Sequence, residues 1–241
     1  MQFFSKIWSK GTANPELEAK LKSILGFAPK NKSLYQTAFT HRSVNIKNDK
    51  GLLINFERLE FLGDSVVDTV VANHLYEKLA QDNEGELTRM KSKIVSREKL
   101  NFIGKELELL DHLVCTGNKD NFGDDIYGNI LEALVGAVFI EKGYEKCKKI
   151  VFKLILDPHI TLNEVKKEII SYKSVLIEWG QKEKKIILFN TEKEESKDTT
   201  INYQCKLIVD DKQLLKVRGS SKKKAEEKAA KRAFNILRIG R

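Results

Sequence analysis

Four carboxylates recur at helical spacing in the stretch NFERLEFLGDSVVD, residues 55–68. They follow one another at intervals of three, four and four residues and are Glu57, Glu60, Asp64 and Asp68. Because an α-helix has about 3.6 residues per turn, this spacing places all four on one stripe of a helix. Opposite them stands an apolar stripe made of Phe56, Leu59, Leu62, Val66 and Val70. The one basic residue within the stretch is Arg58.

An acidic stripe has two interpretations, a solvated helix face or a functional site. Gly63 lies in the middle of the expected helix, where glycine costs about 1 kcal/mol relative to alanine. We therefore expect another segment to approach the backbone there. More oxygen ligands follow along the chain: Glu84 and Glu86 at a helix start, and Asn129 and Glu132 three residues apart on one helix face.

Oxygen ligands gathered from two or three helices, without a cluster of His or Cys, are what a hard cation such as Mg²⁺ prefers. Such an ion keeps several waters and binds phosphate oxygens. It can activate a water and stabilise the leaving oxygen in phosphodiester cleavage. The acidic residues therefore favour a phosphodiesterase site.

The charge of the chain is uneven. The net charge is +9, and residues 171–241 hold 18 Lys and Arg against 10 Asp and Glu. The first 170 residues are nearly neutral, with 25 basic and 24 acidic side chains. This asymmetry indicates a polyanion-binding module joined to a neutral body, although a merely soluble basic surface would give the same count. In the first interpretation the basic module holds a nucleic acid and the acidic cluster cuts it.

Composition narrows the class of protein further. A chain of 241 residues with 41% hydrophobic content can build one large domain, or a medium one and a small one. The three cysteines, Cys115, Cys147 and Cys205, lie far apart, which argues against a zinc site and suits a reducing compartment. The run ALVGAVFI is too short to cross a bilayer, and the N-terminus resembles no signal peptide. We expect a cytoplasmic protein with no membrane partner.

Helical patterns predominate in the first 160 residues, and no convincing strand pattern appears there. The expected helices cover residues 14–27, 32–44, 55–80, 85–107, 124–143 and 144–156, and Asp157-Pro158 is expected to end the last. Asn14 is a candidate N-cap, Pro15 suits the first helical position, and Gly26 is a stop signal. The pattern predicts an all-α domain over residues 14–165.

The periodicity then changes to alternation. In TINYQCKLIVD one side carries Ile201, Tyr203, Cys205, Leu207 and Val209, which predicts a strand with one buried face. Residues 184–190 and 213–219 are two more expected strands. Helices are expected over residues 171–182 and 221–237, the latter with an apolar stripe of Ala225, Ala229, Ala233 and Leu237. The pattern predicts a small α+β domain of order α-β-β-β-α over residues 170–239, with the boundary near residue 168.

Four segments resemble a known family. NFERLEFLGDSVV resembles the ribonuclease III signature, and THRS at residues 40–43 resembles a segment found upstream of it. DNEGELTRMKSKIV and GNILEALVGAVF resemble the next two blocks of that family, in the same order. The tail resembles a double-stranded RNA-binding domain. The resemblance covers nearly the whole chain.

The resemblance implies a homodimeric, Mg²⁺-dependent endoribonuclease for double-stranded RNA, with Mn²⁺ as a substitute and no organic cofactor. It implies hydrolysis to 5′-phosphates and short 3′ overhangs, with precursors of ribosomal RNA and some mRNAs as substrates. The implied metal ligands are Glu60, Asp64, Asn129 and Glu132, of which Asp64 and Glu132 are catalytic. Glu57 and Glu84 match supporting acidic positions, Phe61 matches a contact to the partner subunit, and His41 in THRS is expected to pack or hydrogen-bond.

The chain departs from the family at one metal position. Asn129 stands where the family usually has Asp, so the cluster has one negative charge fewer. An amide oxygen still coordinates Mg²⁺, and Asp124 or Asp125 is a possible compensation. This departure is also the one argument for an alternative function, a non-catalytic double-stranded RNA-binding scaffold that retains the fold.

The tail departs as well. The implied RNA-binding residues are Lys222, Lys223 and Lys224 at the start of the last helix, together with Glu178. Glu226 stands at a usually basic position, Ile177 replaces a common Gln, and TEKEESKD replaces the usual Pro-His loop. We therefore expect weaker and more salt-sensitive RNA binding than is typical of such domains.

Overall fold

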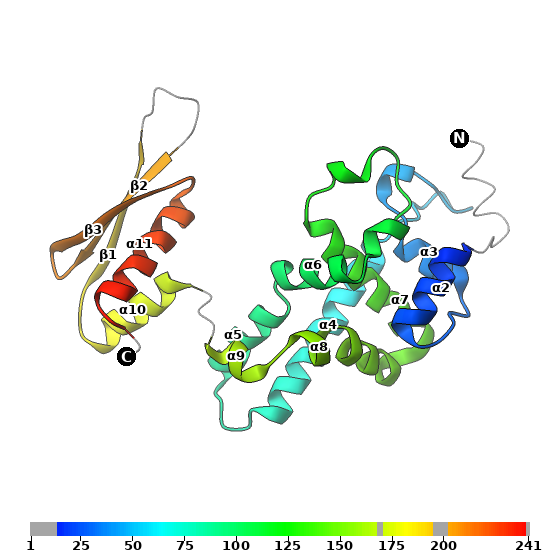
Figure 1. Ribbon diagram of the computed structural model, residues 1–241, viewed down its shortest axis with the longest axis horizontal. Coiled ribbons are helices and arrows are strands. Elements are labelled where there is room, and N and C mark those ends of the chain that lie inside the picture. Colours follow the sequence, from blue (N-terminus) through cyan, green and yellow to red (C-terminus); the bar gives the residue numbers. More distant parts are fainter. Residues whose placement is uncertain (1–13, 168–170, 195–201, 240–241) are drawn as a thin grey trace. The chain divides into compact units, whose positions relative to one another are not determined.

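The computed structural model describes residues 14–167, 171–194 and 202–239. The chain divides into two compact units, Met1–Lys166 and Lys167–Arg241 (Figure 1). Each unit has a hydrophobic core of its own. The predicted fold class is confirmed, because the first unit is helical and the second has the order α-β-β-β-α.

The first unit is built around two long helices, α4 and α7. Its helices are α2 (Pro15–Leu25), α3 (Lys32–Ala38), α4 (Glu57–Lys78), α5 (Glu84–Ile94), α6 (Arg97–Glu106), α7 (Asp125–Val151), α8 (Asp157–His159) and α9 (Leu162–Lys167). Short 3₁₀ turns cover Arg42–Val44, Leu109–His112 and Lys119–Asn121. Among the described residues, no helix has both the length and the apolar character needed to span a membrane.

Local capping explains where several helices begin. Asn14 accepts a hydrogen bond from the Leu17 amide at 3.1 Å, and Gly26 ends α2 at a φ of 75°, both as predicted. The single helix expected over residues 85–107 is wrong. Ser96 interrupts it, because its hydroxyl accepts from the Lys99 amide at 3.3 Å and so starts α6 as a separate helix.

The second half of α7 matches the expectation at one point, the break at Gly143, and differs from it at another, beyond Val151. The helix contains one non-helical residue, Gly143, with a φ of 74°, at the junction expected between two helices. Beyond Val151 one π-helical turn covers Phe152–Leu156, and α8 follows. The helical backbone therefore runs past Asp157-Pro158. Proline is compatible with this position because the first turn of a helix needs no amide donor there.

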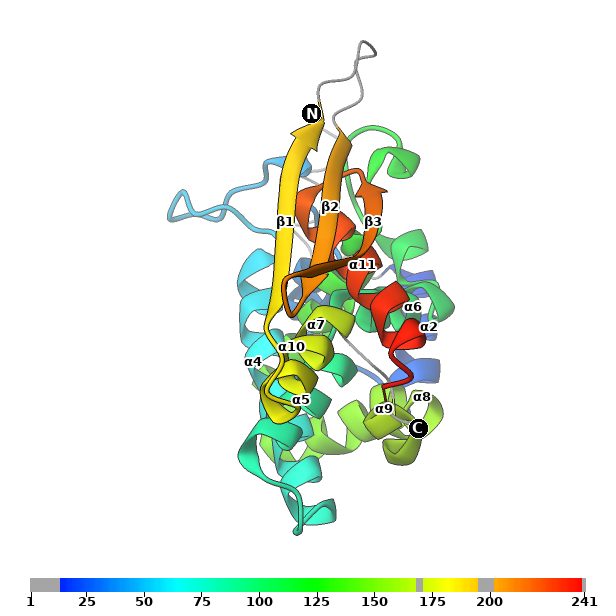
Figure 2. The ribbon, with the colours of Figure 1, turned by 90° about the vertical axis from the view of Figure 1, so that its left-hand side faces the viewer.

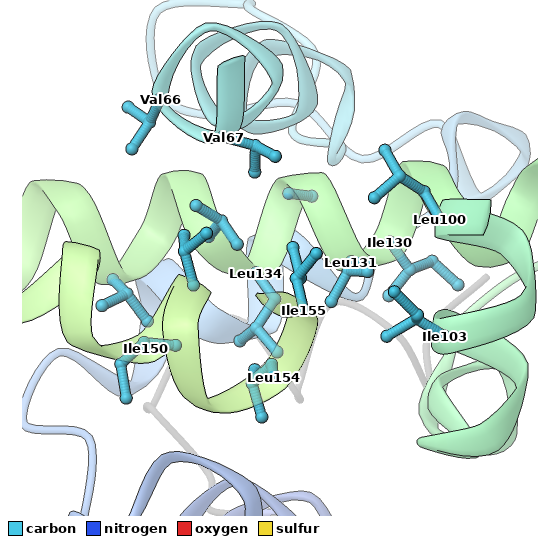
Figure 3. Packing of buried hydrophobic residues seen from close by; sticks show 14 of the residues in the cluster. Val66, Val67, Leu100, Ile103, Ile130, Leu131, Leu134, Ile150, Leu154 and Ile155 are labelled. Atoms are coloured by element: carbon cyan, nitrogen blue, oxygen red, sulfur yellow. The ribbon is translucent and has the colours of Figure 1, made fainter. Parts of the chain in front are cut away.

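The core of the first unit lies around α7. Figure 3 shows Val66 and Val67 of α4 on one side of this helix, and Leu100 and Ile103 of α6 near its start. Ile130, Leu131 and Leu134 of α7 are fully buried between them. These contacts hold α4 and α6 against the same segment of α7.

The second unit is a three-stranded antiparallel sheet with two helices on one face (Figure 2). The strands β1 (Ile187–Glu194), β2 (Asn202–Val209) and β3 (Lys212–Gly219) pair in the order β1-β2-β3. The helices are α10 (Tyr172–Lys182) and α11 (Lys222–Ile236).

Most of the residues predicted to face the interior of the second unit are buried or partly buried. Cys205 and Leu207 are buried, and Tyr203 and Val209 are partly buried, whereas Ile201 lies outside the described residues. Ala225, Ala229 and Ala233 of α11 are fully buried against the sheet. Small side chains allow the helix to pack closely on the strands.

Candidate active site

A cavity of about 870 Å³ opens between α4, α6 and α7. Of the predicted site residues, it is lined by Glu57, Glu60, Asp64, Asn129 and Glu132, and also by Phe61 and His41. Glu60 and Asp64 come from α4, and Asn129 and Glu132 come from α7. The structure thus brings together the four predicted metal ligands from two separate helices.

Two glycines set the distance between α4 and α7. A Cβ atom on Gly63 would lie 1.7 Å from the carbonyl oxygen of Glu132, and one on Gly136 would lie 2.2 Å from the carbonyl oxygen of Leu59. The helix backbones are therefore in direct contact. This confirms the close approach expected at Gly63, and it holds Glu60 and Asp64 beside Glu132.

The carboxylates of the cavity perturb one another. Partial burial raises the pKa of Glu132 to about 8, and the charges of Asp64 and Glu60 add to the effect. Burial and the charge of Glu57 likewise raise the pKa of Glu60. Arg97 opposes both shifts. The cavity consequently holds more negative charge than its own cations balance, which favours a bound cation.

The donor set suits a hard divalent ion. The four side chains present three carboxylates and one amide oxygen, with no sulfur or imidazole among them. Within the described ranges, no group of three or more His, Cys, Asp or Glu side chains is arranged so that it could already hold a metal ion. The four predicted ligands line one cavity.

The outer acidic residues have different surroundings. Glu57 accepts from Arg42 at 3.4 Å and from the Asn55 side chain at 3.3 Å, and it lines the cavity. Glu84 stands at the start of α5 and accepts from the Thr88 hydroxyl at 3.0 Å. It does not line this cavity within one chain.

Asp68, the fourth carboxylate of the predicted stripe, lies apart from the cavity. It forms an ion pair with Lys91 of α5 and does not line the cavity. Charge balance along α4 therefore involves basic residues distant in sequence rather than Arg58 alone. Arg42 and Lys91 pair with the two ends of the acidic stripe, at Glu57 and Asp68.

His41 packs at the wall of the cavity. Its Nδ1 accepts from the Ser43 amide at 3.1 Å, and its ring lies 4.6 Å from the ring of Phe122 and 5.8 Å from that of Phe56. Burial and the nearby charge of Arg42 lower its pKa. These contacts match the packing and hydrogen-bonding role expected for it.

The cavity wall also contains Arg97, Asn101 and Asp125. The sequence had not indicated that these three residues lie together. Asp125, one of two acidic residues considered as compensation for Asn129, accepts from Arg97 at 3.2 Å and from Asn101 at 3.3 Å. Asp124 does not line the cavity. Their spacing could have indicated the group, because residues four apart share a helix face, and both Arg97 with Asn101 and Asp125 with Asn129 have this spacing.

Phe61 is a strongly exposed aromatic residue on α4, with 77% of its surface accessible. A second cavity of about 790 Å³ lies beside it. Its apolar lining includes Leu34, Leu53, Leu62 and Ile140. An apolar side chain and an apolar recess therefore adjoin on one face of the first unit.

The basic residues of the second unit are on its surface. Lys222, Lys223 and Lys224 are exposed in the first turn of α11, where Ser221 caps the helix by accepting from the Lys224 amide at 3.2 Å. Glu178 is exposed on α10.

Glu226 has a structural role within the second unit. It is buried and accepts from Lys173 at 2.6 Å and from the Thr191 hydroxyl at 3.2 Å. It therefore presents no negative charge to a ligand on the surface.

The fold and the cavity define a class of protein: a helical nuclease unit with an acidic cavity, followed by a nucleic-acid-binding α-β-β-β-α unit. Residues 31–159 match a family model described as Ribonuclease-III-like, and residues 172–237 match the double-stranded RNA binding motif. The chain belongs to the ribonuclease III family. It is accordingly an endoribonuclease with a double-stranded RNA-binding domain, as the sequence predicted.

Curated relatives agree over nearly the whole chain. Ribonuclease 3 of Zunongwangia profunda is 46% identical over 90% of this chain and 89% of its own length. Ribonuclease 3 of Flavobacterium psychrophilum is 41% identical over 98% of this chain and 97% of its own length. Membership of this family supports a requirement for a divalent metal ion.

Solved structures support the helical unit. The nuclease domain of ribonuclease III from Campylobacter jejuni is 35% identical and superposes with a TM-score of 0.52, covering 61% of this chain and 99% of its own. A second structure of that domain, described as showing flexibility in a region involved in dimer formation, has a TM-score of 0.51 at 35% identity. It covers 56% of this chain and 94% of its own.

Proposed function

We propose that this chain is a Mg²⁺-dependent endonuclease that hydrolyses double-stranded RNA to 5′-phosphates and short 3′ overhangs. The observation that carries the proposal is the contact between α4 and α7 at Gly63 and Gly136, which sets Glu60 and Asp64 beside Glu132. A cavity with this donor set and this excess of negative charge suits Mg²⁺, with Mn²⁺ as a substitute.

Each of the four central residues has a proposed role. Glu60, Asp64, Asn129 and Glu132 hold the ion through their oxygens. When bound, a divalent ion supplies an activated water and stabilises the leaving oxygen of the phosphodiester. Asp64 and Glu132 act as the catalytic carboxylates, which orient the attacking water and accept its proton. Glu57 and Glu84 support the site as outer acidic residues.

The raised pKa of Glu132 fits this role. Partial burial, together with the nearby charges of Asp64 and Glu60, raises the pKa of Glu132 to about 8 and so favours its protonated form when no cation is near. Positive charge entering the cavity favours the ionised carboxylate. Glu132 is thus a group whose protonation responds directly to the ion, as a catalytic carboxylate requires.

Asn129 remains a ligand in this proposal. Its side chain lines the cavity one helical turn before Glu132, and its amide oxygen binds a cation without adding charge. Asp125 is not a simple replacement for the missing charge, because Arg97 and Asn101 already engage its carboxylate. We expect an active enzyme with a somewhat higher demand for metal.

We propose a homodimer formed through Phe61 and the recess beside it. In a two-fold pair the same face meets itself, so the exposed ring of each protomer can enter the apolar recess of its partner. The Campylobacter jejuni nuclease domain, which is 35% identical, is described as having a region involved in dimer formation, and this supports a dimer of the present chain. Two acidic cavities are then available, one for each strand of the duplex.

The second unit holds the duplex by its phosphates in this proposal. Lys222, Lys223 and Lys224 lie at a helix N-terminus, where backbone amides also favour phosphate, and Glu178 on α10 contributes a further contact. Glu226 stands where such domains usually have a basic residue, and it is buried, so this position adds no cation to the RNA-binding surface. We therefore expect weaker binding than is typical of such domains, and its affinity should still fall with salt because the remaining contacts are made to phosphates.

The cellular role follows from the family. We propose that the protein acts in the cytoplasm on precursors of ribosomal RNA and on some mRNAs.

Incubation of the full chain with a long RNA duplex, in Mg²⁺ or in EDTA, tests the proposal. We expect short duplex products with 5′-phosphates only when Mg²⁺ is present, and no cutting of single-stranded RNA. Binding of the duplex without any cleavage in Mg²⁺ or Mn²⁺ would refute the enzymatic role and favour the RNA-binding scaffold.

A further inference from the structure

We infer that Arg97 is a substrate-binding residue that grips an RNA phosphate at the rim of the acidic cavity, and that Asp125 and Asn101 are positioning residues which hold it ready. The inference rests on the proposed function of the cavity as the place of phosphodiester cleavage. It assigns a role to the wall formed by α6 and the first turn of α7, whose residues lie outside the four-ligand set.

The cavity poses an electrostatic problem for its substrate. Glu57, Glu60, Asp64 and Glu132 all line it, and each RNA phosphate brings a further negative charge. Two arginines also line the cavity, Arg42 and Arg97. A phosphate that approaches the acidic centre must meet one of these cations, or the metal, to be held there.

Arg97 is the better placed of the two arginines. Arg42 pairs at 3.4 Å with Glu57, which belongs to the acidic stripe itself. Arg97 pairs at 3.2 Å with Asp125, which stands outside that stripe, and its side chain lines the cavity and is 86% exposed. It also acts electrostatically on the two central carboxylates, Glu60 and Glu132.

The partners of Arg97 are themselves held in place. The Asn101 side chain donates to Asp125 at 3.3 Å through its nitrogen and accepts from the Gly128 amide at 2.8 Å through its oxygen. A Cβ on Gly128 would lie 2.6 Å from that oxygen, so the glycine leaves the room that this contact needs. The chain of contacts from Gly128 through Asn101 to Asp125 fixes the carboxylate that orients Arg97.

The exposed pair with Asp125 can be exchanged for a phosphate. Ion pairs between solvent-exposed groups contribute little to stability, so releasing Asp125 is inexpensive. A guanidinium binds carboxylate and phosphate with the same planar, two-pronged geometry. Arg97 can therefore exchange the Asp125 carboxylate for an RNA phosphate, and the residues around it need not rearrange.

The test compares RNA binding by the full chain in a Glu132→Gln background, which keeps the duplex intact. The added variants are Arg97→Gln, Arg97→Lys and Arg89→Gln, and the last is a matched control because Arg89 is an exposed arginine outside the cavity. The dissociation constant for a short RNA duplex is measured at several KCl concentrations. Thermal unfolding of each variant checks that the fold is retained.

We expect Arg97→Gln to weaken binding about 10-fold, the order typical of a lost charge-assisted hydrogen bond. The slope of log affinity against log salt should fall by about 0.9 for each phosphate contact removed. Arg97→Lys should retain the slope and lose part of the affinity, because it keeps the charge without the planar fork. An Arg97→Gln slope and affinity equal to those of Arg89→Gln would overturn the inference.

A second comparison tests the positioning role in the otherwise unaltered chain. Asp125→Asn should raise the KM for duplex RNA less than Arg97→Gln does, and the double variant should match Arg97→Gln alone, since Asp125 acts through Arg97. The Mg²⁺ concentration for half-maximal cleavage should not change. A higher Mg²⁺ requirement in Asp125→Asn would instead make Asp125 part of the metal site and overturn the assignment.

The proposed function and the role of Arg97 can be refuted separately. If the unaltered chain cuts no duplex, the proposed function is wrong, whereas the salt slopes still decide whether Arg97 contacts phosphate. If the chain cuts normally and the slopes are equal, only the role of Arg97 is wrong.

Discussion

Substitution of Gly63 by alanine should damage both the stability and the activity of the first unit. The added methyl group would lie 1.7 Å from the carbonyl oxygen of Glu132, 2.6 Å from its carbonyl carbon and 2.9 Å from the Gly136 amide nitrogen. All three are backbone atoms, so no side-chain rotation relieves the overlap. Helices α4 and α7 must move apart along the segment that carries the candidate site.

The size of the effect follows from two opposing contributions. Alanine in a helix interior gains about 1 kcal/mol over glycine. Overpacking a well-filled interior costs typically about 1–3 kcal/mol and sometimes more, and contact between two backbones belongs at the upper end. We expect a net loss of about 2 kcal/mol in the free energy of unfolding, which lowers the melting temperature of a unit of this size by roughly 4–8 °C.

Thermal unfolding of the full chain, followed by circular dichroism, measures the stability. Gly85→Ala is the control, because Gly85 lies in α5 and its nearest atom, Asn83 Oδ1, would be 3.4 Å from the new methyl group. We expect little change in that variant. Cleavage by Gly63→Ala, measured below its melting temperature, should fall more than its RNA affinity does. A Gly63→Ala variant that is as stable and active as Gly85→Ala would refute the account of the helix crossing.

Three further predictions concern the same unit. The pKa of Glu132 is raised to about 8 in the folded protein. Its contribution to the free energy of unfolding is therefore complete below the unfolded pKa near 4.5 and is progressively lost as the pH rises through 8. Urea unfolding in EDTA should show stability that falls between these two pH values, with a flatter profile in Glu132→Gln and recovery on adding Mg²⁺. Asn129→Asp restores a charge to the ligand set and should lower the Mg²⁺ concentration for half-maximal cleavage several-fold, whereas an unchanged or higher requirement would contradict its role as a ligand. Phe61→Asp should shift the protein from dimer to monomer in sedimentation, while Tyr76→Asp, at an equally exposed aromatic residue of α4, should leave it dimeric; a dimeric Phe61→Asp would exclude the proposed interface.

The central features of the site could be predicted from the sequence, because they depend on local spacing. Intervals of three and four residues placed Glu60 and Asp64 on one helix face, and the same rule paired Asn129 with Glu132. Gly63 indicated a close contact, because glycine destabilises the middle of a helix and the approach of another segment would explain its presence there. The structure adds that Glu132 is itself at that contact.

The remaining features depend on partners distant in sequence, which periodicity does not reveal. Asp68 pairs with Lys91 of the next helix, and Arg97 meets Asp125 across 28 positions. The break at Ser96 depends on a single capping hydroxyl within an otherwise continuous helical pattern. In the sequence, Glu226 stands at a usually basic position of the RNA-binding pattern. In the structure it is buried and accepts hydrogen bonds from Lys173 and Thr191.

The most direct test of the account is the rate of duplex cleavage in Mg²⁺ by Glu132→Gln. The control is Glu145→Gln, an exposed carboxylate on the same helix and outside the cavity. We predict that Glu132→Gln binds the duplex and does not cut it, because the partly buried carboxylate proposed to hold the metal ion and orient the water is lost, while Glu145→Gln cuts at the normal rate. Cleavage by Glu132→Gln at the normal rate would show that the chemistry takes place elsewhere.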